Sequence, residues 1–143
     1  MNIFTIGFAQ KSAEEFFTLL INNKVKKLID IRLNNKSQLA GFANAKHLPY
    51  FLKLHGIDYK YKPELAPTKE LLNGYKNKEI SWQEYEKIYN KILLDRNILN
   101  TISVNTLEDS VFLCSEPTAE QCHRRLAAEY LAESSKNIKI KHL

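Results

Sequence analysis

The chain alternates between short apolar segments and longer segments whose apolar residues have helical spacing. Residues 2–6 (NIFTI) and 110–114 (SVFLC) are apolar at nearly every position, and residues 25–31 (VKKLIDI) end the same way apart from one aspartate. This is the pattern of a strand buried on both faces. Residues 57–62 (IDYKYK) and 136–141 (KNIKIK) alternate apolar and charged positions, as half-exposed strands do. The pattern predicts five strands, with the third and fifth at the edges because their lysines point outward.

The segments between these strands carry signals for helices. Three pairs of residues fit the capping box, in which two side chains each bond a free backbone N–H at the start of a helix: Ser12 with Glu15, Ser81 with Glu84, and Thr118 with Gln121. A shorter helix is predicted around residues 49–55, where Gly56 ends it, and another over residues 98–107. The polar connection of residues 33–46 is long for a compact domain, and such loops are often functional.

Strands that alternate with helices predict a parallel sheet covered by helices on both faces. A chain of 143 residues fits one core, so we expect a single α/β domain over residues 1–143. It would be a three-layer sandwich around a mostly parallel five-stranded sheet. With right-handed crossovers and the third and fifth strands at the edges, the expected strand order is 3-2-1-4-5. The chain then reverses direction between the first and fourth strands.

Ligands of open parallel sheets bind beyond the carboxyl ends of the strands, where the chain reverses direction. Three segments are expected to meet there: residues 7–10 (GFAQ) after the first strand, residues 30–32 (DIR) at the end of the second, and residues 114–116 (CSE) after the fourth. The last helix begins there too, and its free N–H groups and positive dipole end favour an anion. The sequence thus predicts a pocket between these segments.

The last helix places its polar residues unevenly around its axis. Its buried face is defined by four residues: Leu126, Ala127, Tyr130 and Leu131. At about 3.6 residues per turn, His123 lies near the middle of this face, Cys122 and Arg124 flank it, and Arg125 points away. We therefore expect His123 under the strand tips and Arg124, rather than Arg125, beside a ligand. The alternative for His123 is a core histidine bonded to a carbonyl.

The other candidates also have structural alternatives to a functional role. Arg124 is either a ligand-binding group or a cation paired with a carboxylate such as Glu116 or Asp30. Cys114 ends a strand before a helix N-terminus, which stabilises a thiolate, but cysteine is also a good small core residue. Asp30 lies in an apolar strand, so it is either a salt-bridged brace for Arg32 or a general base.

Composition narrows the function classes. The formal net charge of +5 permits an anionic partner, although the lysines are scattered along the chain, as on a solvated surface. No apolar stretch is long enough to span a bilayer, and the start MNIFTIGFAQ is not a signal peptide. We expect a cytoplasmic protein without membrane contact. In that compartment its two cysteines are expected to be free thiols rather than a disulfide.

Several common chemistries are excluded by spacing. A phosphatase loop needs an arginine at the position after Cys114 where this chain has Glu120. The four glycines are too far apart to form a Gly-rich phosphate loop. A cysteine, seven residues and then Cys122-His123 match no usual zinc ligand spacing. The sequence therefore predicts neither a metal ion nor a cofactor.

Four segments of the chain resemble a known family: TIGFAQKSAEEF, LIDIRLNNKSQLAGFA, PELAPTKELL and LCSEPTAEQCHRRLAAEYL. They are similar to the family of domain of unknown function 488, and SQLAGFA is similar to one subfamily of it. In much of the family the first strand ends Thr-Ile-Gly-His-Ser. Phe8 and Ala9 stand here instead, so any role of that histidine is missing or passed to another group such as His47. The resemblance implies that the pocket segments hold the family's signature positions, but it implies no reaction: Gly7, Asp30, Arg32, Cys114, Glu116, Cys122, His123 and Arg124.

Three functions follow from this placement. The first is a small enzyme or binding domain for an anionic, phosphate- or nucleotide-like compound. Its acting residues would be Cys114, Glu116, His123 and Asp30, and its binding residues Gly7, Arg32, Ser115, Cys122 and Arg124. The second is a nucleic-acid-associated domain that uses the lysines and tyrosines of the third strand and the loop residues Asn34, Asn35, Lys36, Phe42 and Lys46. The third is a structural or adaptor domain without catalysis.

Overall fold

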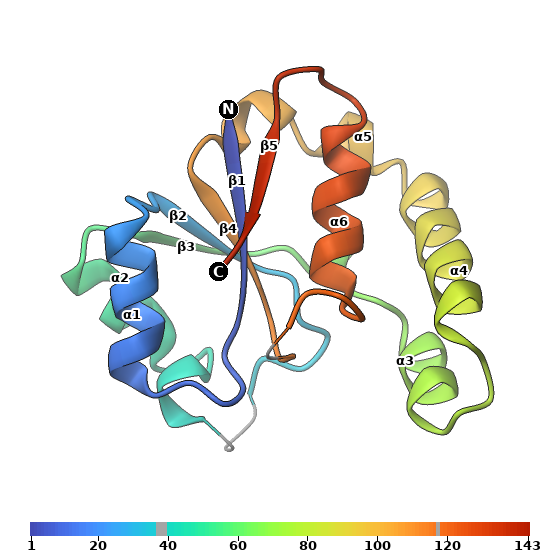
Figure 1. The fold of residues 1–143 in the computed structure, drawn as a ribbon, viewed down its shortest axis with the longest axis horizontal. Helices are drawn as coiled ribbons and strands as arrows, with labels where there is room; N and C mark the ends of the chain where they lie inside the picture. The colour runs from blue at the N-terminus through green and yellow to red at the C-terminus, as the bar shows by residue number, and fades with distance from the viewer. Residues whose placement is uncertain (37–39, 117) are drawn as a thin grey trace.

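A five-stranded sheet forms the centre of the computed structural model, which describes residues 1–36, 40–116 and 118–143 (Figure 1). Every strand pair is parallel, and helices lie on both faces of the sheet. The predicted α/β fold class is therefore confirmed. The strands are β1 (Asn2–Gly7), β2 (Lys27–Asp30), β3 (Asp58–Tyr61), β4 (Ser110–Cys114) and β5 (Lys139–His142).

The strand order is β3-β2-β4-β1-β5, which differs from the predicted 3-2-1-4-5 because β4, not β1, lies beside β2. The edges agree with the prediction, since β3 and β5 are the outer strands. The burial pattern could not order β1 and β4, because all of β4 is buried, and all of β1 except Asn2. β1 takes β5 as its second neighbour, and a 2.6 Å hydrogen bond between Thr5 Oγ1 and His142 Nδ1 links the two strands.

One face of the sheet is covered by α1 (Ala13–Asn22) and α2 (Leu48–Leu54), which lie side by side (Figure 1). Phe16 and Leu20 of α1 and Leu52 of α2 pack there in one apolar cluster with side chains of β1, β2 and β4. Gly56, with a φ of 70°, follows the end of α2, as the sequence predicts.

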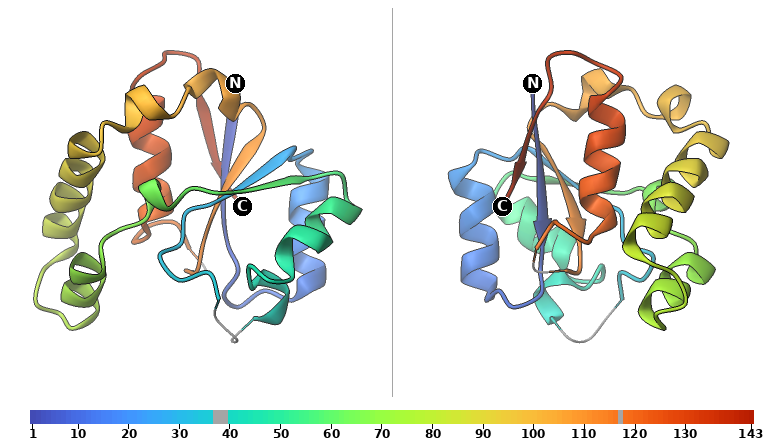
Figure 2. Two further views of the ribbon diagram at one scale, coloured as in Figure 1. Left: turned by 180° about the vertical axis from the view of Figure 1, so that it is seen from behind. Right: turned by 45° about the vertical axis from the view of Figure 1, so that its right-hand side comes forward.

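The opposite face carries α6 against the sheet and α4 outside it (Figure 2). A second apolar cluster fills this side and includes Tyr89, Leu93 and Leu131. No helix within the described ranges is both long and apolar enough to cross a membrane. The helices of this side are α3 (Lys69–Lys76), α4 (Trp82–Asp95), α5 (Ile98–Thr101) and α6 (His123–Ala132).

Two of the predicted helix starts are formed by the expected side chains. Ser81 Oγ accepts from the backbone N–H of Glu84 at 3.1 Å, and Glu84 Oε1 accepts from the N–H of Ser81 at 3.2 Å, which completes a capping box. Ser12 Oγ likewise accepts from the N–H of Glu15 at 3.1 Å. Local sequence therefore determines where α1 and α4 begin.

The prediction is wrong for two other helical segments. The last helix begins at His123 and not at Thr118. The side chain of Gln121 is engaged elsewhere, where its Oε1 accepts a 2.7 Å hydrogen bond from Tyr75 Oη on α3. The helix predicted over residues 98–107 is interrupted at Ile102, which is extended and buried in the core. A 3-10 turn, Val104–Leu107, follows it.

The reversal of chain direction still lies between β1 and β4. From β1 the chain moves through β2 to the β3 edge, and from β4 it moves past β1 to the β5 edge. Exchanging β1 and β4 leaves the carboxyl ends of β2, β4 and β1 next to one another. The fold therefore keeps the crevice that the sequence predicts, at the end of the sheet where Gly7, Asp30 and Cys114 lie.

Candidate functional site

A pocket of about 320 Å³ opens beyond the carboxyl ends of β2 and β4. One side is formed by the chain after β2, starting at Arg32, and the other by the chain after β4 and the start of α6. His123 joins the two sides, because its Nε2 lies 2.8 Å from the carbonyl oxygen of Ile31. Loops distant in the sequence thus share one mouth, lined by Arg32, Leu33, Asn34, Cys114, Ser115, Glu116, Thr118, Gln121, Cys122 and His123 together with side chains of α3 and α4.

The tip of β2 holds a buried ion pair. Arg32 donates from Nε to Oδ1 of Asp30 and from Nη2 to Oδ2, each at 2.8 Å, and both residues are almost wholly buried. Tyr59 Oη also donates to Oδ2, at 2.7 Å, and the guanidinium lies 5.5 Å from the centre of the Phe8 ring. Burial, together with this hydrogen bond to Asp30, raises the pKa of Tyr59. The geometry is that of the predicted brace, since both oxygens of Asp30 accept hydrogen bonds.

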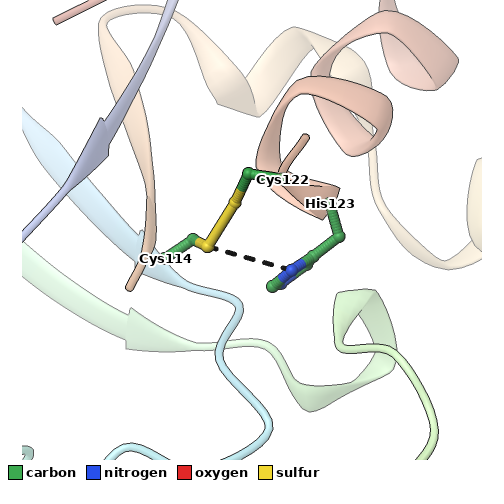
Figure 3. A group of neighbouring side chains, drawn as sticks. All are labelled: Cys114, Cys122 and His123. Carbon is green, nitrogen blue, oxygen red and sulfur yellow. Dashed lines mark hydrogen bonds between the residues drawn. A yellow bond between two sulfur atoms is a disulfide. The ribbon is translucent and has the colours of Figure 1, made fainter. Parts of the chain in front are cut away.

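His123 is held in one tautomer. A carbonyl oxygen only accepts, so Nε2 carries the proton that is donated to Ile31, and Nδ1 is left with its lone pair. That nitrogen faces the sulfur of Cys114 at 3.9 Å (Figure 3). The imidazole is buried, with the ring of Tyr89 edge-on 5.9 Å away. Burial lowers the pKa of His123 to about 4, so the ring is neutral at pH 7. The predicted position under the strand tips is confirmed.

The two cysteines correct the sequence prediction. Cys114 and Cys122 form a disulfide (Figure 3) and are not free thiols. Cys114 ends β4 and Cys122 caps α6, and both residues are buried and form the pocket floor together with Arg32. The expectation of free thiols depended on the inferred compartment, whereas the pairing depends on how the end of β4 and the start of α6 lie together in space. In the bridged form Cys114 has no thiolate to act as a nucleophile.

Arg124 is buried behind the tip of β1, with 1% of its surface exposed. Its Nη1 donates to the carbonyl oxygen of Glu116 at 2.7 Å, and its Nε has no hydrogen-bond partner among the described residues. Burial lowers the pKa of Arg124 to about 10. A Cβ on Gly7 would collide with the same carbonyl oxygen and with Nη1. Of the two alternatives for Arg124, the pair with a carboxylate is not formed within the described chain. The neighbouring Arg125 points away, and its Nη2 lies 2.6 Å from Oε1 of Glu86.

The wall opposite this floor is aromatic, which sequence reasoning missed. Trp82 and Tyr85 on α4 stack with ring centres 4.7 Å apart at 15°, and Tyr75 on α3 packs edge-on 5.4 Å from Trp82. All three rings line the pocket. Trp82 and Tyr85 are three residues apart on α4, and in the sequence this spacing indicates core packing. Only the placement of α3 and α4 beyond the strand tips shows that these rings also border a cavity.

A comparison with family models assigns residues 12–131 to the family described as Domain of unknown function DUF488. The match covers far more than half of the 143 residues. The chain belongs to the DUF488 family. No curated protein and no solved structure matches it. The DUF488 assignment confirms the resemblance and leaves the SQLAGFA-type subfamily as a prediction.

Most of the predicted signature positions lie within the DUF488 match and at the pocket end of the sheet. Gly7 and Phe8 precede the matched residues. Phe8, which stands where the resemblance places a histidine, packs against the guanidinium of Arg32. His47 does not take that histidine's place in the pocket, since it is exposed at the start of α2. Of the SQLAGFA segment, residues 37–39 lie outside the described residues.

Proposed function

We propose that this DUF488 domain binds a small anionic ligand that carries an aromatic ring, of the nucleotide kind, at the carboxyl ends of β2 and β4. The observation that carries the proposal is the pairing of a polar, hydrogen-bonding floor with an aromatic wall in one pocket. The pocket volume of about 320 Å³ falls at the lower end of the range for small-molecule sites, roughly 300–1,000 Å³. A mononucleotide has both a charged group for the floor and a flat ring for the wall.

The floor offers donors whose direction is fixed. Asp30 occupies Nε and Nη2 of Arg32, and Nη1 makes no hydrogen bond to the described residues. A guanidinium oriented in this way suits a phosphate, because charge-assisted hydrogen bonds depend on geometry as well as charge. The N-terminus of α6 adds a positive dipole end beside Cys122. These two groups support an anion at the β2 side of the mouth.

The wall supports the ring. Trp82 is partly exposed and lines the pocket, with Tyr85 in a parallel stack against it, so the indole can stack on a planar group in the pocket. Stacking of a base on an aromatic side chain contributes about 1–3 kcal/mol by alanine substitution. Glu116 is exposed and lines the pocket. For a reaction that follows binding, we assign proton transfer to this residue. Asp30 is unsuited to that role because its oxygens are occupied.

The single tryptophan of the chain provides the test. Titration with adenosine monophosphate should quench Trp82 fluorescence saturably, adenosine should quench more weakly, and inorganic phosphate should compete without quenching. Arg32→Lys keeps a cation for Asp30 but loses the free guanidinium edge, so it should weaken adenosine monophosphate at least about tenfold and leave adenosine nearly unchanged. Arg125→Lys makes the same change outside the pocket and is the matched control.

Four results would contradict the proposal. Quenching that does not saturate with purine or pyrimidine monophosphates, or an equal effect of Arg32→Lys and Arg125→Lys, would remove the nucleotide-like ligand. Binding of a thymidine oligonucleotide that falls steeply with salt, without binding of mononucleotides, would favour the nucleic-acid alternative. Phe42, which that alternative needs for stacking, packs against Phe16 and Phe17 at 5.3 and 6.0 Å. No response to any of these probes would leave the structural or adaptor role.

A further inference from the structure

We infer that reduction of the disulfide converts Cys114, Cys122 and His123 into a three-ligand site for a zinc-like divalent ion, with its fourth position open to the pocket. The three ligand atoms, two sulfurs and one imidazole nitrogen, all lie within 4.8 Å of one another, and all three residues are buried. The site goes beyond nucleotide binding, since it needs no nucleotide to form.

The separations fit one tetrahedral ion. With Zn–S bonds of about 2.3 Å and a Zn–N bond of about 2.0–2.1 Å, the two sulfurs stand about 3.8 Å apart and each sulfur about 3.6 Å from the nitrogen. Nδ1 of His123 already lies 3.9 Å from the sulfur of Cys114. Once the S–S bond is broken, the sulfurs need only separate by rotation of their side chains, while the imidazole stays where it is.

The histidine is prepared as a ligand. Histidines that bind metals almost always donate their other ring N–H to a carbonyl or a carboxylate, which fixes the tautomer and the ring orientation. His123 does this through Nε2 to Ile31 at 2.8 Å, so the free lone pair of Nδ1 points at the sulfurs (Figure 3).

The three ligands lie at the ends of two regular elements of the fold. Cys114 ends β4, the middle strand of the sheet, and pairs with Gly7 of β1. Cys122 and His123 start α6, whose positive dipole end favours thiolates. Three protein ligands with one position left for water or substrate are the arrangement of catalytic rather than structural zinc. The open position faces the cavity that Ser115 and Glu116 also line.

Metal binding and the disulfide exclude one another. Two molecules of a small thiol, such as glutathione, reduce the Cys114–Cys122 bond to two thiols and leave as their own disulfide. The divalent ion then displaces the two thiol protons and binds both sulfurs as thiolates. The sequence did not reveal the site, because adjacent Cys122-His123 ligands match no usual zinc motif. Here the two residues contribute to one centre, with Cys122 as the N-cap and His123 as the first residue of α6.

Cobalt(II) tests the inference without any nucleotide. The 143-residue chain is reduced with a phosphine, separated from the phosphine under argon and titrated with Co²⁺, beside a sample that is kept oxidised. The reduced protein should bind one equivalent with a thiolate-to-cobalt charge-transfer band and strong tetrahedral d–d bands, which Zn²⁺ then abolishes. The oxidised protein should show neither band. A ¹⁵N spectrum of the imidazole should show the Nδ1 signal of His123 shifting on Zn²⁺ binding, while Nε2 stays protonated.

Variants assign the ligands. Cys114→Ser and Cys122→Ser should each lower the affinity for Co²⁺ by more than the roughly 10–100-fold that follows when a group hydrogen-bonded to a ligand is lost, and His123→Gln should do the same. His47→Gln, at an exposed histidine, is the matched control and should bind as the wild type does. The inference is overturned if reduced wild-type protein gives no thiolate charge transfer, or if the double Cys→Ser variant binds Co²⁺ equally well. Adenosine monophosphate binding by the metal-free oxidised protein is a separate measurement, so either proposal can fail alone.

Discussion

Arg32 and Arg124 are buried at the same end of the sheet, but their hydrogen-bond partners differ. Arg32, 2% exposed, meets the carboxylate of Asp30 with two parallel hydrogen bonds. Arg124, 1% exposed, meets only the carbonyl oxygen of Glu116 and keeps an Nε without a partner among the described residues. The β2 tip therefore has a compensated charge, whereas the tip shared by β1 and β4 has an uncompensated one.

The difference extends to neighbouring groups. The positive charge of Arg124 adds to burial in lowering the pKa of Lys11 and of His142, on the two sides of β1. Arg32 lies two residues from its partner, so β2 forms its ion pair locally. By contrast, α6 brings Arg124 to the sheet without a salt bridge to any described carboxylate, and the charge of Glu116 acts on it only at longer range. One tip is built as a fixed brace, and the other retains positive potential. Substitutions can separate the two roles.

Removal of the brace should have the largest effect. Arg32→Ala leaves Asp30 buried without a cation, which should lower the free energy of unfolding by about 3–5 kcal/mol. Replacing both partners, Asp30→Leu with Arg32→Met, should cost less than the single substitution, because no buried charge remains. Urea denaturation monitored by circular dichroism measures both variants. A double variant less stable than Arg32→Ala would show that the pair does not act as a brace.

His123 lies between the tips of β2 and β4. The pH dependence of stability that it causes is the next largest expected effect. Its pKa is about 4 in the fold and 6.5 in the unfolded chain, so the unfolded state takes up the proton first. Its contribution is complete above pH 6.5 and is lost as the pH falls towards 4, by about 3 kcal/mol in total. Urea titrations of the metal-free protein between these pH values should show that loss in wild type and in His47→Gln. His123→Gln should lack it, and parallel profiles would contradict the neutral buried imidazole.

The sequence predicted the elements and the end of the sheet that carries the pocket. Ser81 with Glu84 and the run 110–114 contain their own signals, a capping box and an unbroken apolar segment, so α4 and β4 begin where expected. It could not order β1 and β4, because both are apolar on both faces. Neighbour choice between two such strands depends on tertiary packing and leaves no local pattern.

The candidate site was predictable in its polar half only. Helical spacing identified His123 and Arg124 as inward residues, and both are buried. The disulfide and the aromatic wall depend on where a turn and a helix pair lie in space, which spacing does not encode. Tyr75 donates a hydrogen bond to Gln121 across the pocket rim, which connects the aromatic wall to the residues before α6. A long-range contact of this kind leaves no trace in the local capping signal at Thr118.

A side chain added at Gly7 should strain the tip of β1. In Gly7→Ala the new Cβ would collide with the carbonyl oxygen of Glu116 and with Arg124, and overpacking of this kind costs about 1–3 kcal/mol. Gly74→Ala, inside α3 with only Ile80 at 3.8 Å, should instead stabilise the protein by up to about 1 kcal/mol. Thermal unfolding of the two variants compares the same added methyl group at a crowded and an open position. Equal effects would mean that Gly7 is not needed for this close approach.

The smallest stability change is expected where the charge is uncompensated. Arg124→Met loses the hydrogen bond to Glu116 but also removes a buried cation with an unpaired Nε, so the free energy of unfolding should change by only about 1 kcal/mol. Arg125→Met, which breaks half-exposed pairs with Glu86 and Glu129, should also cost less than about 1 kcal/mol.

The stabilities of the Arg124 and Arg125 variants therefore do not separate the roles of the two arginines, but the pKa of His142 does. Arg124 lowers that pKa more than Arg125 does, so an NMR titration should show a larger rise in Arg124→Met. A similar rise in both would mean that the positive potential at β1 comes from the surface of α6 rather than from the buried guanidinium.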